Sequence, residues 1–287
     1  MINYNPKNWF SFIFSFHKSD TARILWKELI YIGILTSIIA YVQIHVFPNA
    51  DYLKNLTTVY SLLGFVISLL LVFRTNTAYD RWWEGRRMWG SMVNDSRNFV
   101  SKISVMDLSL ETRKRIGVLV PLFSFSVKEH LRSNRVDGNV LIGDEEKKSF
   151  AETDHQPLWV IKELRELIQG LKNQGKMDNI ELNLLNQNLD RLVDSLGACE
   201  RIRNTPIPFS YSLFIKKFIF IYVVTMPLAF VEIFGYYAVF ISTFVFYALV
   251  SMELLAEEIE DPFGTDENDL PTDALCDTIR RNTESFI

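Results

Sequence analysis

The chain has 287 residues, of which 48% are hydrophobic and 14% aromatic, and its mean hydropathy is +0.09. That value is high for a water-soluble protein and low for a chain buried wholly in lipid, so we expect membrane-spanning and water-facing parts of comparable size. The formal net charge of −4 comes from 30 basic and 34 acidic residues, and no basic stripe with interleaved aromatics accompanies it, which argues against nucleic-acid binding.

The amino-terminal segment, residues 1–27, is aromatic rather than signal-like. It lacks the charged start, single apolar core and small residues of a secretory signal. We expect a cytoplasmic or interfacial segment whose rings lie along the membrane interface or pack on the protein. The rings are those of Trp9, Phe10, Phe12, Phe14 and Phe16.

Two uncharged runs follow, and each has the length of one membrane crossing. Leu29–Phe47 holds 19 residues without Asp, Glu, Lys or Arg, and Leu56–Phe73 holds 18. At about 1.5 Å of rise per helical residue, either run crosses a hydrocarbon core. We therefore predict a first transmembrane helix at residues 28–48 and a second at residues 56–80.

A third apolar stretch is too long for one crossing. Phe218–Met252 contains one charged residue, Glu232, so we predict two helices joined by a tight turn near Glu232–Gly235. Glu232 and Glu253 border these spans and are expected to reach water without a special function. The two predicted helices are residues 209–233 and 236–256.

Basic residues gather on one side of the predicted spans. Lys and Arg are frequent before the first span and after the second, whereas the 48–55 connection carries only Lys54. The positive-inside rule then places both termini in the cytoplasm. We predict a multi-pass protein of the cell membrane (inner or plasma membrane), with a cytoplasmic helical domain at residues 81–208 and a cytoplasmic acidic carboxyl-terminal segment at residues 257–287.

The 81–208 segment is predicted to be mainly helical. Five apolar residues recur at 4-3-4-3 spacing and form a seam along one helix face. Residues 134–157, which contain Asp137–Gly138, Gly143 and a mixed run of charges, are predicted to be a loop. The seam residues are Leu185, Leu189, Leu192, Leu196 and Cys199.

The chain has two cysteines, Cys199 and Cys276. They are too few for a disulfide framework and lack metal-ligand spacing, so we expect two reduced thiols.

Enzyme motifs are missing from the sequence. It contains no GxGxxG, no phosphate-binding GxxxxGKS/T, no GxSxG and no HExxH, so a membrane enzyme is disfavoured. A non-conducting membrane scaffold, whose cytoplasmic helices bind a partner, is an open alternative to a channel. The four histidines are scattered without ligand spacing: His17, His45, His130 and His155.

The second predicted span carries an apolar stripe. Phe65, Leu69 and Phe73 stand at i, i+4 and i+8, so they line one helix face with a rise of about 6 Å per step. Gly64 beside them allows a neighbouring helix to approach closely. Spacing alone leaves three roles for the stripe open: a lipid-facing surface, a buried surface or a pore wall.

Three motifs stand in order along the chain. Arg81, Trp82 and Trp83 follow the second predicted span, Ile207–Pro208 opens the third, and Asp261–Asp269 (Asp-Pro-Phe-Gly-Thr-Asp-Glu-Asn-Asp) follows the fourth. Together they resemble the motifs of the bestrophin family, and the short link between the third and fourth spans resembles its bacterial branch. The resemblance covers most of the chain and implies an all-α integral membrane protein with four transmembrane helices and a helical cytoplasmic domain.

The same resemblance implies an ion channel. Bestrophins are homopentamers in the lipid bilayer, and the second span of each subunit lines one central pore. The family's neck rings, which act as a hydrophobic gate, fall on Phe65, Leu69 and Phe73, and its cytoplasmic aperture falls on Ile180. The implied permeant species are monovalent ions, with chloride and other anions typical of the family and monovalent cations such as sodium as the bacterial alternative.

The acidic segment matches the calcium clasp of animal bestrophins. Carboxylate oxygens are ligands that calcium prefers, but the bacterial branch implied by the resemblance does not need calcium. Two readings stay open, a calcium site or a solvated acidic strap around neighbouring subunits, and no cofactor is expected to be required. The matching residues are Glu258, Asp261, Asp266 and Asp269.

Overall fold

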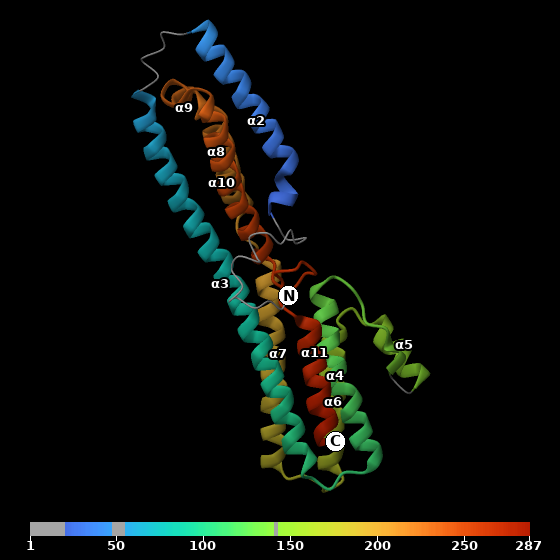
Figure 1. The fold of residues 1–287 in the computed structure, drawn as a ribbon. Coiled ribbons are helices and arrows are strands. Elements are labelled where there is room, and N and C mark those ends of the chain that lie inside the picture. Colours follow the sequence, from blue (N-terminus) through green and yellow to red (C-terminus); the bar gives the residue numbers. More distant parts are fainter. Residues whose placement is uncertain (1–20, 48–54, 141–142) are drawn as a thin grey trace. The chain divides into compact units, whose positions relative to one another are not determined.

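A computed structural model describes residues 21–47, 55–140 and 143–287 of the chain (Figure 1). The regular structure of these residues consists of helices without a strand, which confirms the all-α prediction. The predicted aromatic cluster between Trp9 and Phe16 and the connection at residues 48–54 lie outside the described residues.

The chain divides into two compact units. The chain passes from one unit to the other after Arg81, after Thr205 and after Glu260. We call the unit with the predicted membrane spans the span unit and the other one the bundle unit. Within the described residues, the span unit comprises residues 21–47, 55–81 and 206–260, and the bundle unit comprises residues 82–205 and 261–287.

The span unit is built from long apolar helices. Among the described residues, three stretches have the length and composition to cross a membrane: Thr21–Val46, Leu56–Ser104 and Phe209–Glu260. The second of these is one uninterrupted helix, α3, which continues past the predicted end at residue 80 into the bundle unit. The others are α2 (Thr21–Val46), α8 (Phe209–Thr225), α9 (Pro227–Phe234), the short 3-10 helix η3 (Gly235–Tyr237) and α10 (Ala238–Glu260).

The third apolar stretch doubles back on itself. Helix α10 packs against both α8 and α9 (Figure 1), because the chain reverses at η3. Gly235 has a φ of +55°, a conformation that costs a glycine little and a residue with a Cβ much more. The tight turn expected near Glu232–Gly235 is therefore present.

The bundle unit has a core formed by several packed helices. The second half of α3 contributes Trp89 and Phe99, and α7 contributes the five seam residues, all of them buried. The predicted seam is thus confirmed as the core-facing side of α7. The remaining helices are α4 (Leu110–Leu131), η2 (Gly138–Val140), α5 (Asp144–Glu152), α6 (Gln156–Asn173), α7 (Asn179–Asn204) and α11 (Thr272–Phe286).

The prediction of a loop at residues 134–157 is wrong for its second half, which forms helix α5. Three acidic residues occupy the first turn of α5, where the partial positive charge of the helix end stabilises them. Phe150 is fully buried and meets Trp159 edge-on, with ring centroids 5.2 Å apart. One buried ring therefore anchors a helix whose remaining residues are mostly polar.

Both cysteines are free and buried in the bundle unit. Burial raises the pKa of Cys199 and of Cys276 to about 12, so the reactive thiolate is scarce near neutral pH. We expect a maleimide to leave the folded protein unlabelled at pH 7.5 and to label two thiols per chain after denaturation in detergent, as read by mass spectrometry. Labelling of the folded chain at either site would contradict this packing.

Candidate ion pathway

The predicted neck residues lie on an exposed face of α3. Phe65, Leu69 and Phe73 are 67%, 45% and 55% exposed in the single chain. Large apolar side chains that remain this exposed in a compact unit require lipid or another protein surface beside them. The geometry thus rules out a buried stripe, and it leaves a lipid-facing surface or a pore wall shared between subunits.

The opposite face of α3 is packed against α8. Ile67 and Leu71 are buried in one cluster with Ile219 and Tyr222 of α8. A Cβ added at Gly64 would lie 2.8 Å from the Tyr222 hydroxyl oxygen, closer than real contacts permit. The close approach predicted at Gly64 is confirmed, and the packing fixes which face of α3 is turned outward.

Hydroxyl groups beside the stripe are satisfied within the helix itself. Ser61 donates to the carbonyl of Thr57 at 2.9 Å, and Ser68 donates to the carbonyl of Gly64 at 2.8 Å. Thr77 donates in the same way to the carbonyl of Phe73 at 2.9 Å. Such bonds leave no need for an ion or water partner, so the stripe keeps an apolar character.

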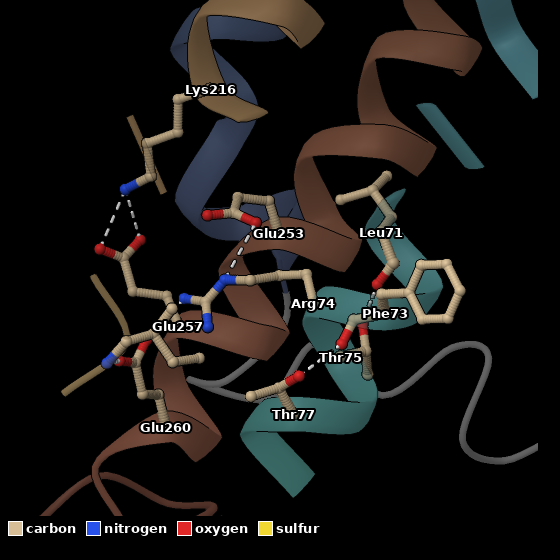
Figure 2. Close-up of polar contacts among 10 residues, drawn as sticks. Leu71, Phe73, Arg74, Thr75, Thr77, Lys216, Glu253, Glu257 and Glu260 are labelled. Carbon is tan, nitrogen blue, oxygen red and sulfur yellow. Dashed lines mark hydrogen bonds and ion pairs between the residues drawn. The ribbon is translucent and has the colours of Figure 1, made fainter. Parts of the chain in front are cut away.

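An arginine is buried directly after Phe73, the last predicted neck residue. Arg74 is 1% exposed, and its Nη2 lies 2.6 Å from Oε2 of Glu260 (Figure 2). Its Nε lies 3.7 Å from Oε2 of Glu253, which is an ion pair too long for a hydrogen bond. Arginine stays charged in proteins, so these two carboxylates supply the compensating charge.

Glu260 connects three parts of the span unit. Its Oε1 accepts the backbone N–H of Ile207 at 2.7 Å, and its backbone carbonyl accepts Nε–H of Arg81 at 3.1 Å. Together with the bond from Arg74, these contacts join the Arg74–Arg81 part of α3 to the start of α8 and the end of α10. The motif residues Arg81 and Ile207 thus meet at one acidic side chain.

The expectation that Glu253 reaches water is wrong. This carboxylate is 3% exposed, and neither of its oxygens is hydrogen-bonded to another described residue. The missed signal lies in α10, where Glu253, Glu257 and Glu260 share one face at helical spacing. Glu257 pairs with Lys216 at 2.8 Å on the exposed side (Figure 2), whereas Glu253 and Glu260 share Arg74.

The Arg-Trp-Trp motif also contacts the acidic segment, inside the bundle unit. The indole Nε1 of Trp82 donates to the carbonyl of Asn268 at 3.0 Å, and Phe263 is buried against Gly85. Trp82 of the Arg-Trp-Trp motif and the acidic segment are therefore packed together, which gives a structural reason for the residue types at these contacts.

The predicted calcium ligands occupy different surroundings. Asp261 and Asp266 are exposed, whereas Asp269 is buried and its Oδ2 accepts the backbone N–H of Asp266 at 2.6 Å. That bond closes a turn within the segment itself. Glu258 belongs to the span unit, whereas the three aspartates belong to the bundle unit. Calcium binding here stays a prediction.

Ile180, the predicted aperture residue, stands in the first turn of α7 and is 70% exposed. The turn is held by a capping box, in which Asp178 accepts the backbone N–H of Glu181 at 2.7 Å and Glu181 accepts that of Asp178 at 2.9 Å. The cap stabilises the helix end from which the exposed Ile180 side chain projects.

These features define a class. Long apolar helices with an outward-facing apolar stripe, and a second unit with its own core, are those of a helical membrane protein. The chain belongs to the bestrophin family, because the model of the family described as "Bacterial/Fungal Bestrophin protein" matches residues 1–285.

Similar proteins cover nearly the whole chain. A voltage-dependent anion channel-forming protein of Nostoc sp. is 35% identical over 98% of this chain and 92% of its own. The voltage-dependent anion channel-forming protein YneE of Salmonella typhimurium is 31% identical over 97% of this chain and 91% of its own. These relatives are named as channels, which agrees with the expectation that the chain is not an enzyme.

The fold is also that of solved bestrophin structures. The crystal structure of a bacterial bestrophin homologue from Klebsiella pneumoniae superposes with a TM-score of 0.84 at 30% identity, and the match covers 91% of this chain and 98% of that one. Both comparisons agree with the family resemblance drawn from the three motifs.

Proposed function

We propose that this chain is the subunit of a bestrophin-type homopentameric channel that conducts monovalent anions. The observation that carries the proposal is the exposed stripe of Phe65, Leu69 and Phe73 on a helix whose other face is packed. Relatives named as voltage-dependent anion channel-forming proteins support the ion class.

The stripe supports a cyclic assembly. One chain offers a single apolar stripe and cannot surround a bore, whereas a closed ring of copies turns its stripes toward one axis. The number of five subunits is taken from the bestrophin family. In this arrangement the hairpin of α8, α9 and α10 supplies two of four membrane crossings. Both termini and the bundle unit lie in the cytoplasm, as the distribution of basic residues favours.

The proposed gate is hydrophobic. Five apolar side chains at one level form a constriction that water vacates when the bore is narrow. An ion that enters it loses hydration without gaining ligands, which is costly. A small outward movement of α3 restores water, so modest changes in helix position can start or stop conduction.

A recording of reversal potential tests the ion class. Full-length protein in a planar bilayer, under a tenfold gradient of potassium chloride, is expected to reverse near the chloride equilibrium potential. Reversal near the potassium potential would replace the anion proposal with the cation alternative.

We further propose that no cofactor is required, so chelation of calcium should leave the current unchanged. Absence of any current, together with a monomeric mass in native mass spectrometry, would overturn the channel itself.

Ile180 provides a narrower prediction. If five copies of this side chain ring the cytoplasmic exit, Ile180→Ala should change single-channel conductance or the ratio of chloride to nitrate permeability. Leu184→Ala, at an exposed apolar position one turn along α7, is the matched control and should leave both quantities unaltered. Identical values for wild type and Ile180→Ala would remove this residue from the pathway.

A further inference from the structure

Two histidines that are far apart in the sequence meet at one glutamate in the bundle unit. His130 lies in the last turn of α4, His155 precedes the first turn of α6, and Glu200 lies near the end of α7. The Nε2 atoms of both rings are 2.8 Å from the same oxygen, Oε1 of Glu200. The ring centroids of the histidines are 4.4 Å apart.

The three donors lie in or next to three different helices. The backbone carbonyl of His130 accepts a bond from Nη1 of Arg203 at 2.8 Å, which ties the end of α4 to α7. Glu200 directly follows Cys199, a buried member of the core seam. All three side chains are half-buried, so the donors are positioned by the core and still reachable from solvent.

The three donor atoms suit one small cation. One oxygen and two imidazole nitrogens lie within 4.8 Å of one another, and they form the one such group of three among the described residues. Zinc bonds to imidazole and carboxylate at about 2.0–2.2 Å, which sets two tetrahedral ligands about 3.4 Å apart. The present separations of 2.8 Å need to open only slightly.

The donor types select the metal class. Imidazole nitrogen with a carboxylate favours zinc, cobalt or nickel, whereas calcium takes six to eight oxygens. Two imidazoles and one carboxylate leave at least one position for water, which the half-buried setting can supply. Hard alkali and alkaline-earth ions are poorly matched to two nitrogen ligands.

Metal binding requires that the ring hydrogen of each neutral histidine be on Nδ1, because the Nε2 lone pair must face the metal. For His155 this displaces the contact in which Nδ1 accepts the backbone N–H of Leu158, at 3.4 Å. That contact is at the limit of a hydrogen bond, so little is lost when it opens.

We propose that His130, His155 and Glu200 form a site for a divalent first-row transition-metal ion, zinc by preference, which clamps the ends of α4, α6 and α7 together. The site lies entirely within the bundle unit and uses none of the residues assigned to the ion pathway. The proposed metal site can therefore be tested independently of the proposed channel.

Calorimetric titration with zinc chloride tests the site. The full-length protein, solubilised in detergent and freed of metal by a chelator, should bind one zinc ion per chain. His130→Gln with His155→Gln should weaken binding by more than the roughly 10- to 100-fold that loss of an outer-sphere partner costs. His45→Gln is the matched control, because His45 lies in the span unit beside Tyr236, and it should bind zinc like the wild type.

Two results would overturn the site. One is the absence of a stoichiometric zinc-binding event in the wild type, and the other is unchanged affinity in the double variant. X-ray absorption of the zinc-loaded wild type supplies a measurement that does not depend on the folding of a variant. It should show imidazole scattering from two rings, and a spectrum without histidine ligands would contradict the assignment.

Discussion

Replacing Phe65, Leu69 and Phe73 together with alanine is expected to raise chloride flux strongly. Each substitution removes most of a large apolar side chain, so five copies widen the proposed constriction at three successive levels. A wider bore keeps its water, and the ion no longer loses its hydration. Because each 1.4 kcal/mol removed from a barrier multiplies a rate by ten, a flux increase of about tenfold or more is expected.

Efflux of chloride from loaded liposomes measures this effect. The chain offers a matched control in α2, where Ile30, Ile34 and Ile38 form an exposed apolar stripe with the same i, i+4, i+8 spacing. We expect that stripe to face lipid, so its triple alanine variant should conduct like the wild type. An equal rise in both variants would indicate leaky or misfolded protein rather than an opened neck. Unchanged flux in the α3 variant would remove the gate.

Replacing Arg74 with methionine is expected to destabilise the span unit by about 3–5 kcal/mol, since a buried carboxylate loses its compensating charge. Arg74 is 1% exposed and faces Glu253 and Glu260. The substitution keeps the length of the side chain but removes the guanidinium. Thermal unfolding of the detergent-solubilised protein, followed by tryptophan fluorescence, should show a lowered midpoint.

Two further variants separate charge balance from shape. Adding Glu253→Leu and Glu260→Gln to Arg74→Met removes the uncompensated charges, and the glutamine can still accept the N–H of Ile207. This triple variant should recover most of the lost stability, because apolar replacement of a whole buried ion group is often tolerated. If it is no more stable than the single variant, charge compensation is not the reason for the cluster.

A surface ion pair serves as the reference. Lys216 and Glu257 are 2.8 Å apart and both remain about half exposed. Water and salt screen such a pair, so Lys216→Met should change the free energy of unfolding by less than about 1 kcal/mol. A loss as large as that of Arg74→Met would show that burial does not distinguish the two pairs.

The Arg74 cluster also bears on the proposed gate. The arginine follows Phe73 directly, and its bond to Glu260 fixes this level of α3 to the end of α10 and the start of α8. These contacts restrain the rotation of α3 about its axis and thereby the direction in which Phe73, a proposed neck residue, points. Loosening this anchor is therefore expected to alter the resting flux, in addition to its effect on stability.

Much of the fold can be predicted from local patterns. Runs of 18 and 19 uncharged residues predict apolar helices, because a helix hides its own backbone polar groups and needs only apolar side chains. The 4-3-4-3 seam of α7 predicts its buried face for the same kind of reason: helical periodicity decides which residues share a side. The turn at Gly235 and the close approach at Gly64 also follow from their immediate surroundings.

The sequence by itself therefore determined the helices, their apolar faces and, through three motifs, the family. Only the tertiary structure decided which charged groups are buried and which distant side chains meet. Glu253 is buried because α10 directs it toward Arg74 of α3. The contact of Phe150 with Trp159 of α6 stabilises a helix in a mostly polar segment. His130, His155 and Glu200 converge because three helices pack their ends together, and contacts between residues so far apart leave no trace in spacing along the chain.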